Sequence, residues 1–229
     1  MKKPRFDEGG AVVPDARDMK NHPILPLLLS AVAVSAAPAN IPAELKYDRV
    51  AVEYASGGDG RSYGISGEAL LGGHFLLGGG VLENKFKQYG TTAGRSTGFK
   101  LGYKFTLGQG DLIASALYGQ VQASGQIPAS GTTGAKSIAL QGSETTYDLT
   151  WRQRINENYE FSVGYDYATS RQTLRSTLGT TVTNVATKDH VDSVNLGLRY
   201  NFSANLDVTL GYSFVSGGNV WSLSTGYSF

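Results

Sequence analysis

The sequence predicts an all-β fold, an antiparallel up-and-down transmembrane β-barrel of ten strands. Apolar and polar residues alternate along most of the chain after residue 46, which is typical of strands with one apolar face. Every second connection between the alternating segments is short, and the long connections fall between the short ones. Tyr, Phe and Trp collect near the ends of the apolar face, where a membrane-interface girdle would lie. Eight or twelve strands remain alternatives if loops hide or replace strands.

The alternating segments define the strands in chain order. Residues 159–167, YEFSVGYDY, are the clearest case, with Tyr, Phe and Val on one face and Glu, Ser, Gly and Asp on the other. Segment 74–86 is apolar on both faces near its start, and segment 111–122 does not reveal its apolar face. We expect strands at residues 47–55, 61–71, 74–86, 97–107, 111–122, 143–153, 158–170, 189–202, 205–215 and 219–229.

The three long connections, residues 87–96, 123–142 and 171–188, all fall at one end of such a barrel. Transmembrane barrels have short periplasmic turns and longer outer loops, whereas a soluble β-sandwich has no such requirement. The polar face consists of Gly, Ser, Thr and charged residues, which cannot form the core of a soluble domain but can line a hydrated lumen. Closure is expected because an open strand edge in lipid leaves backbone groups unsatisfied.

Residues 1–39 are expected to lie outside the fold. Residues 24–34 form an apolar run of signal-peptide length, and Ala37-Pro38-Ala39 fits a small-x-small cleavage site. We expect export to the outer membrane, translation from Met19 and therefore an upstream extension at residues 1–18. Residues 40–46 are then a periplasmic segment, and residues 47–229 form the barrel. The first 39 residues hold five of the 20 basic and four of the 19 acidic residues, so the remainder is formally neutral and gives no argument for nucleic acid as a partner.

Acidic and basic residues balance on the polar face. A barrel of about eight strands is filled by its own side chains and one of about sixteen leaves a channel, so ten strands favour a filled or very narrow lumen. Unpaired buried ions are costly, so we expect Arg199 to pair with Asp207, and Glu160 with Arg152 or Arg154. The predicted lumen charge network is Arg49, Glu53, Glu68, Lys100, Lys104, Asp148, Arg152, Arg154, Glu160, Asp166, Arg199 and Asp207.

Other basic residues gather near the predicted outer rim. Lipid phosphates attract such residues electrostatically, and the alternative for each of them is a solvated loop position. The candidate lipid-phosphate contacts are Lys85, Lys87, Arg95, Arg171, Arg175 and Lys188. Outer-membrane lipids, including lipopolysaccharide, are therefore expected partners.

The chain ends in an alternating strand, NVWSLSTGYSF, whose last residue is Phe229. With this strand and the overall pattern, residues 45–229 resemble small bacterial outer-membrane barrels of the OmpA-membrane-domain, Ail/OmpX and opacity-protein type. In that family the barrel-assembly machinery recognises a terminal aromatic residue preceded by alternating apolar residues. The resemblance assigns this signal to Trp221, Leu223, Tyr227 and Phe229, with Thr225 as a departure, and the strand should close the barrel against residues 47–55. Residues 57–80 show a weaker similarity to quorum-factor-like outer-membrane barrels.

The sequence offers few candidate catalytic residues. Two of the three histidines, His74 and His190, follow residue 39, and His190 and Ser193 should point to opposite faces of one strand. No metal-ligand spacing is present, and no cofactor is expected. We expect a monomeric, non-enzymatic barrel with a structural role or a surface-contact role through its outer loops. The alternatives are a small porin-like channel for ions or small solutes, and a hydrolase with His190 at a rim-sited active site.

Overall fold

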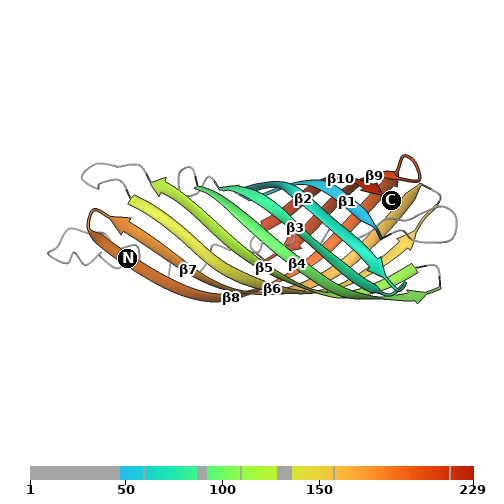
Figure 1. Ribbon diagram of the computed structural model, residues 1–229, viewed down its shortest axis with the longest axis horizontal. Helices are drawn as coiled ribbons and strands as arrows, with labels where there is room; N and C mark the ends of the chain where they lie inside the picture. The colour runs from blue at the N-terminus through green and yellow to red at the C-terminus, as the bar shows by residue number, and fades with distance from the viewer. Residues whose placement is uncertain are drawn as a thin grey trace, which may run out of the picture.

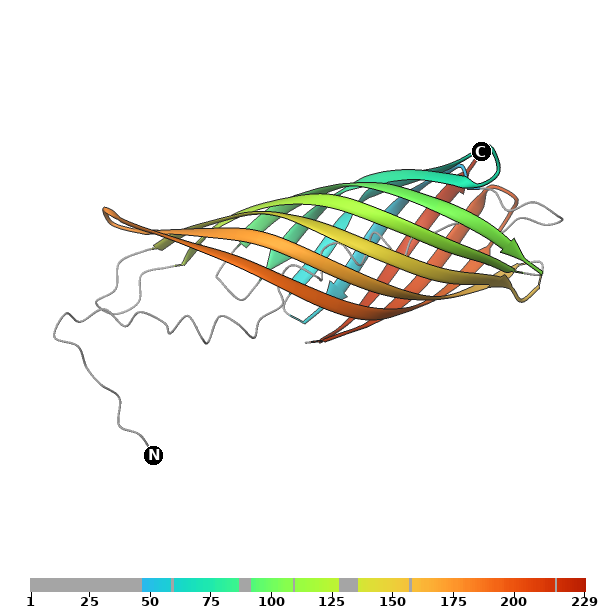
Figure 2. The same cartoon turned by 90° about the horizontal axis from the view of Figure 1, so that it is seen from below.

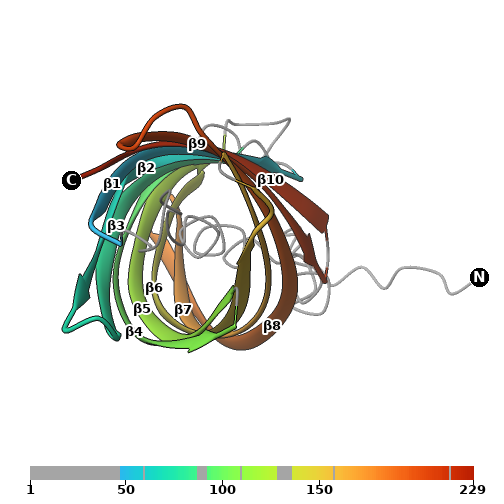
Figure 3. The same cartoon turned by 90° about the vertical axis from the view of Figure 1, so that its right-hand side faces the viewer.

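The computed structural model describes residues 47–58, 60–86, 92–108, 110–127, 136–156, 158–216 and 218–229. These residues form ten antiparallel strands that close into a barrel, which confirms the predicted fold class and strand count (Figures 1 and 3). Each strand pairs with its neighbours in the sequence, and the first strand pairs with the last. Within these ranges no helix is long and apolar enough to cross a membrane.

The strands differ greatly in length. β1, β9 and β10 have nine to eleven residues, which is about the length that a tilted strand needs to cross a bilayer, whereas β5 to β8 have 18 to 21. The strands are β1 (Arg49–Gly57), β2 (Gly60–Leu71), β3 (Phe75–Phe86), β4 (Thr92–Leu107), β5 (Gly110–Ile127), β6 (Lys136–Arg154), β7 (Tyr159–Leu178), β8 (Thr181–Asn201), β9 (Leu206–Val215) and β10 (Gly218–Ser228).

The extra length of β5 to β8 lies at one end of the barrel (Figure 2). We call this the projecting end, and it carries the β7–β8 turn at residues 179–180. The opposite end, which we call the turn end, carries the tight connections at residues 72–74 and 202–205. The barrel wall is therefore lopsided, with β5 to β8 reaching far beyond β1, β9 and β10.

The prediction of a long loop at residues 171–188 is wrong. These residues continue β7 and β8 as a hairpin in which Leu178 pairs with Thr181, and Gly179 supplies the positive φ of 58° in the turn. The predicted loop at 123–142 is also mostly strand, since β5 runs to Ile127 and β6 starts at Lys136. Thr and Val favour strands as much as large apolar residues do, but in these segments they give a weak alternation signal.

The third predicted long loop, residues 87–96, is shortened by the start of β4 at Thr92. Residues 87–91 and 128–135 lie outside the described residues, as do residues 1–46, on which the signal-peptide, start-site and periplasmic-segment predictions fall. The end-to-end asymmetry expected from loop length is therefore largely an asymmetry of strand length.

Alternation along most strands places large apolar residues outside the barrel and charged residues inside. In β7, Phe161, Val163 and Tyr165 are exposed, while Glu160 and Asp166 are 3% and 2% exposed. This inverts the burial pattern of a soluble protein and is the pattern of a lipid-embedded barrel. The wall thus has an apolar outer face and a charged inner face.

One part of the lumen does not follow the expected polar pattern. Leu76 and Leu82 of β3 and Ile113 and Leu117 of β5 are all buried, at 3% exposure or less. They occupy the inward alternation positions of the two strands whose faces the sequence left ambiguous. Apolar side chains of β3 and β5 therefore share the lumen with the charged residues.

Candidate functional sites in the lumen and on the projecting wall

Five charged residues form a continuous buried chain inside the lumen. An Arg49 Nη atom lies 2.6 Å from Asp207 Oδ1, and Arg199 Nε lies 3.2 Å from the same oxygen. A further Arg199 nitrogen lies 3.7 Å from Glu160 Oε2, and Arg152 Nε donates to Glu160 Oε1 at 2.5 Å. Basic and acidic groups alternate along this chain, so every ion has an oppositely charged neighbour.

The strand register explains which residues meet. Asp207 stands opposite Asn201, and Arg199 reaches it from the next inward position of β8. Glu160 stands opposite Arg154, yet its ion pair is with Arg152, one inward position further along β6. Arg49 reaches Asp207 past β10, so this ion pair bridges the seam where the first and last strands meet.

Tyr47 closes the turn end of the lumen. It precedes β1, is 1% exposed, and its hydroxyl donates a hydrogen bond to Asp111. The Lys104 ammonium lies 4.9 Å and the Arg152 guanidinium 5.3 Å from the centroid of its ring. Its apolar body packs with Leu76 and Ile113 in one buried cluster. The ring therefore contacts both charged and apolar residues of the lumen.

Neither Tyr47 nor Asp111 was a sequence-predicted site residue. Asp111 follows a tight turn and precedes Ile113 and Leu117 on the same face, so its strand showed no polar stripe. Tyr47 shares the inward face of Arg49, but as an aromatic residue it adds nothing to a polar stripe on that face. Neither position therefore carried a periodic signal.

The remaining predicted lumen residues also lie in strands but make different contacts. Lys100 Nζ lies 3.0 Å from Glu68 Oε2, a second buried ion pair. Glu53 accepts a hydrogen bond from Ser66. Lys104 and Arg154 form no ion pair with a carboxylate of the described residues, and Lys104 instead lies over Tyr47.

Asp148 and Asp166 are neighbours across β6 and β7. Asp148 accepts hydrogen bonds from Thr150 at 2.6 Å and from Ser115 at 3.0 Å, and Asp166 accepts one from Asn195 at 2.6 Å. Neutral donors therefore surround these two carboxylates. Buried side chains that bind one another thus line the lumen.

His190 does not combine with Ser193. His190 is exposed on the outer face, 6.3 Å from the Tyr167 ring centroid, whereas Ser193 is buried and its hydroxyl lies 3.4 Å from Asp166 Oδ2 in the lumen. Over the described part of the chain, no group of three or more His, Cys, Asp or Glu residues could hold a metal ion. His190 and Ser193 therefore do not form a nucleophile and base pair.

Several basic residues lie on the outer face toward the projecting end. Lys85, Arg95, Arg171, Arg175 and Lys188 are all exposed, and by strand alternation they share the outer face with the apolar band. Lys87, the sixth predicted lipid-phosphate contact, lies outside the described residues.

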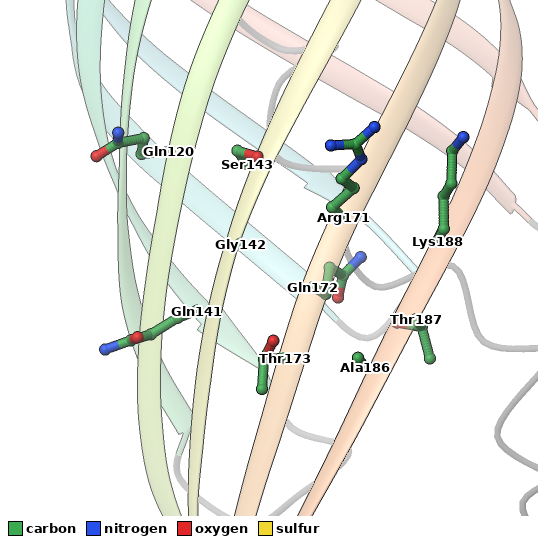
Figure 4. A pocket seen from close by; sticks show the side chains of 10 residues that line it. All are labelled: Gln120, Gln141, Gly142, Ser143, Arg171, Gln172, Thr173, Ala186, Thr187 and Lys188. Carbon is green, nitrogen blue, oxygen red and sulfur yellow. The ribbon is translucent and has the colours of Figure 1, made fainter.

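A shallow groove of about 530 Å³ lies on the projecting wall between β5 and β8 (Figure 4). The register aligns Gln120, Ser143, Arg171 and Lys188 in one row across these four strands. Figure 4 shows the Arg171 and Lys188 side chains extending in the same direction from adjacent strands. Amides, hydroxyls and two cations line the groove, and among the described residues no carboxylate does. This chemistry suits an anionic, hydroxyl-rich ligand.

Comparison with known proteins bears on the fold. A search of solved structures finds the translocator domain of the autotransporter NalP from Neisseria meningitidis, with a TM-score of 0.55 over 89% of this chain and 94% of that chain. This chain has the fold of a small bacterial outer-membrane β-barrel. The sequence identity to the NalP domain is 10%, so the likeness concerns the fold alone.

Two other barrels are similar at lower scores. The outer-membrane protease OmpT from Escherichia coli has a TM-score of 0.46 and 11% identity, covering 80% of this chain and 94% of that chain. Ail, the attachment invasion locus protein of Yersinia pestis, has a TM-score of 0.39 and 14% identity, covering 80% of this chain and 99% of that chain. No family model and no curated protein matches the sequence of this outer-membrane-type barrel.

Proposed function

We propose that this barrel resides in the outer membrane, conducts no solute, and acts at the cell surface through its projecting wall. The strand lengths carry this proposal, because β5 to β8 have about twice the residues that a crossing requires. The turn end then faces the periplasm, and the projecting end faces outward. The buried ion pairs and Tyr47 support a closed lumen.

The outer basic residues are proposed to bind the phosphates of outer-leaflet lipids such as lipopolysaccharide. Arg171 and Lys188 lie in the groove, above the Tyr147 and Tyr167 pair of the outer aromatic girdle. Phosphate accepts charge-assisted hydrogen bonds from both kinds of cation. Sugar hydroxyls would find partners in Gln120, Gln141 and Ser143.

Binding of fluorescent lipid A, with and without its phosphates, to the refolded protein in neutral micelles tests this role. Arg171→Gln and Lys188→Gln should each weaken binding of the phosphorylated form about fivefold, since each basic residue near anionic lipid contributes about 1 kcal/mol. Lys136→Gln, on the opposite face of the projecting wall, is the control and should have no effect. Equal binding of phosphorylated and dephosphorylated lipid A would overturn the phosphate assignment.

The same preparation separates the two alternative functions. A porin-like channel requires a steady conductance in a planar bilayer, which the closed lumen should not give. A hydrolase at the rim would release fatty acid from lipid, and His190→Ala would abolish that release. We expect no hydrolysis by the wild-type protein, because His190 and Ser193 lie on opposite faces of β8.

A further inference from the structure

β8 has a long free edge in the projecting wall. Its pairing with β9 begins at Ser193, which stands opposite Val215, and continues toward the turn end. Its pairing with β7 covers Thr181 to Tyr200. Residues 181–192 therefore have a neighbour on the β7 side, and no strand of the described residues covers their other side. Figure 2 shows this hairpin reaching beyond the rest of the barrel.

The backbone geometry identifies which groups face the free edge. The Asn201 N–H donates to Asn158 O, on the β7 side of β8, at 2.8 Å. The β7–β8 register continues without a bulge to the turn, and successive residues of a strand alternate in the side to which they direct their backbone groups. Even-numbered residues from 182 to 192 therefore present their N–H and C=O groups to the free edge.

This edge lacks the protective features that usually prevent strand addition. Residues 181–187, TVTNVAT, contain no charge and no proline, and Thr and Val favour extended backbone. The first charges of the edge strand, Lys188 and Asp189, lie nearer the barrel. A row of unpaired backbone groups on such a strand is a template for another strand.

The charges beside the edge specify the partner further. On the outer face, Lys188 lies on β8 itself and Arg171 and Arg175 lie on the neighbouring β7. Two strand spacings are about 10 Å, roughly one Debye length at 0.1 M salt, so all three cations act on a strand docked beside β8. Asp189 lies on the opposite face. Asp192 shares the outer face with Lys188 but lies at the barrel end of the free edge, where the Tyr165 hydroxyl donates a hydrogen bond to it at 2.5 Å.

We propose that the free edge of β8 binds an extended segment of another protein by antiparallel β-strand addition. The segment carries carboxylate side chains on the face that it shares with Arg171, Arg175 and Lys188. Backbone hydrogen bonds give the affinity, and the alternating carboxylates give the specificity. This inference deepens the surface role proposed above and rests on it.

A second copy in the same membrane does not fit this edge. Strands of such barrels tilt by roughly 35–45° from the membrane normal. Where the β8 edges of two copies meet, the copies face opposite ways, so their strands tilt in opposite senses and cross at roughly 70–90°. A hydrogen-bond ladder needs aligned strands, and a separate, extended polypeptide can supply one.

The test titrates the refolded protein in micelles with a synthetic twelve-residue peptide of alternating Thr or Val and Glu. Ala186→Pro removes one edge-facing N–H without touching the β7 ladder, and Ala186→Val is the matched control that keeps it. We expect Ala186→Pro to weaken binding at least tenfold and Ala186→Val to change it less than threefold. Amide exchange should slow at residues 182, 184, 186 and 188 when the peptide binds.

Three results would overturn the inference. They are equal binding by Ala186→Pro and the wild type, no binding by the wild type, and dimerisation that protects the same amides without peptide. A peptide with Lys in place of Glu should bind at least tenfold more weakly, and equal binding would refute the acidic partner. Conductance and lipid A binding in the same preparation report on the proposed function independently, so failure of the edge alone leaves that function standing.

Discussion

Glu68 and Lys100 illustrate how single residues hold this barrel closed. The two are nearly buried, lie 3.0 Å apart, and come from strands separated by β3. Removing one member of a buried ion pair leaves the other charge uncompensated, which costs more than the pair itself contributes. The lumen charges are therefore best tested as pairs.

Lys100→Met should lower the free energy of unfolding by about 3–5 kcal/mol, because it leaves Glu68 buried without its cation. Lys100→Met combined with Glu68→Gln should recover most of that loss. Urea unfolding of the refolded protein, followed by its sheet spectrum, measures both changes. A double variant as unstable as the single one would show that the ion pair is not the source of the loss.

The sequence predicted the inward position of these charges because each lies on a polar stripe of period two. It did not predict the partners of Asp148 and Asp166, which are hydroxyl and amide groups rather than cations. Partner choice depends on the register and side-chain reach across several strands, and neither has a periodic signature. Tyr47 and Asp111 were missed for the same reason, since their contact spans 64 residues of chain.

At the scale of elements, the projecting hairpin of β7 and β8 is the main difference between expectation and structure. Alternation of large apolar residues reveals strands that face lipid, and it ends where the wall leaves the membrane. Beyond that level the hairpin relies on Thr, Val and strand pairing, with β7 bonded to β8 from Arg171–Lys188 to Leu178–Thr181 and to β6 over the same residues. We therefore expect that the tip of this hairpin can be removed without loss of the barrel fold.

Replacing residues 173–186 with Asn-Gly should leave the barrel intact. Gln172 already stands opposite Thr187, whose N–H faces β7, and Asn-Gly forms the two-residue turn that joins such strands. The sheet spectrum and heat-modifiable gel mobility should match the wild type, and the free energy of unfolding should change by about 1 kcal/mol or less. The control removes residues 160–165 and 194–199, an equal length from the part that crosses the membrane, and it should prevent folding. If the tip variant also failed to fold, the tip would not be independent of the barrel.

The terminal strand β10 combines a structural position with a proposed assembly signal. Its Trp221, Leu223 and Tyr227 are exposed outside, and the Phe229 N–H donates to Asp48 O at 3.1 Å beside the seam. Deletion of Phe229 should reduce assembly in cells, because the aromatic residue of the proposed signal is gone. Refolding into micelles should proceed normally, because the deletion removes only one backbone hydrogen bond. Comparing membrane-inserted protein in cells with refolded yield measures this, and normal assembly in cells would contradict the signal.

At the scale of the whole molecule, the two halves of the barrel differ in what they bury and expose. The turn-end half is packed inside with ion pairs and Tyr47, and the projecting half exposes polar and basic surface. The sequence predicted closure and strand count, since both follow from alternation and the cost of open edges in lipid. It could not predict the lopsided height of the wall or the groove, because these depend on where strand pairing stops rather than on residue pattern.

Conductance across a planar bilayer tests the central claim that this barrel is closed and acts from its outer wall. The refolded protein should be inserted in its heat-modifiable form and held at constant voltage in 1 M potassium chloride. The account predicts no steady current steps, because it proposes that the buried Tyr47 and the Arg49–Asp207, Arg199–Glu160 and Arg152–Glu160 pairs block the lumen. Uniform, long-lived open steps would contradict it and favour the channel function instead.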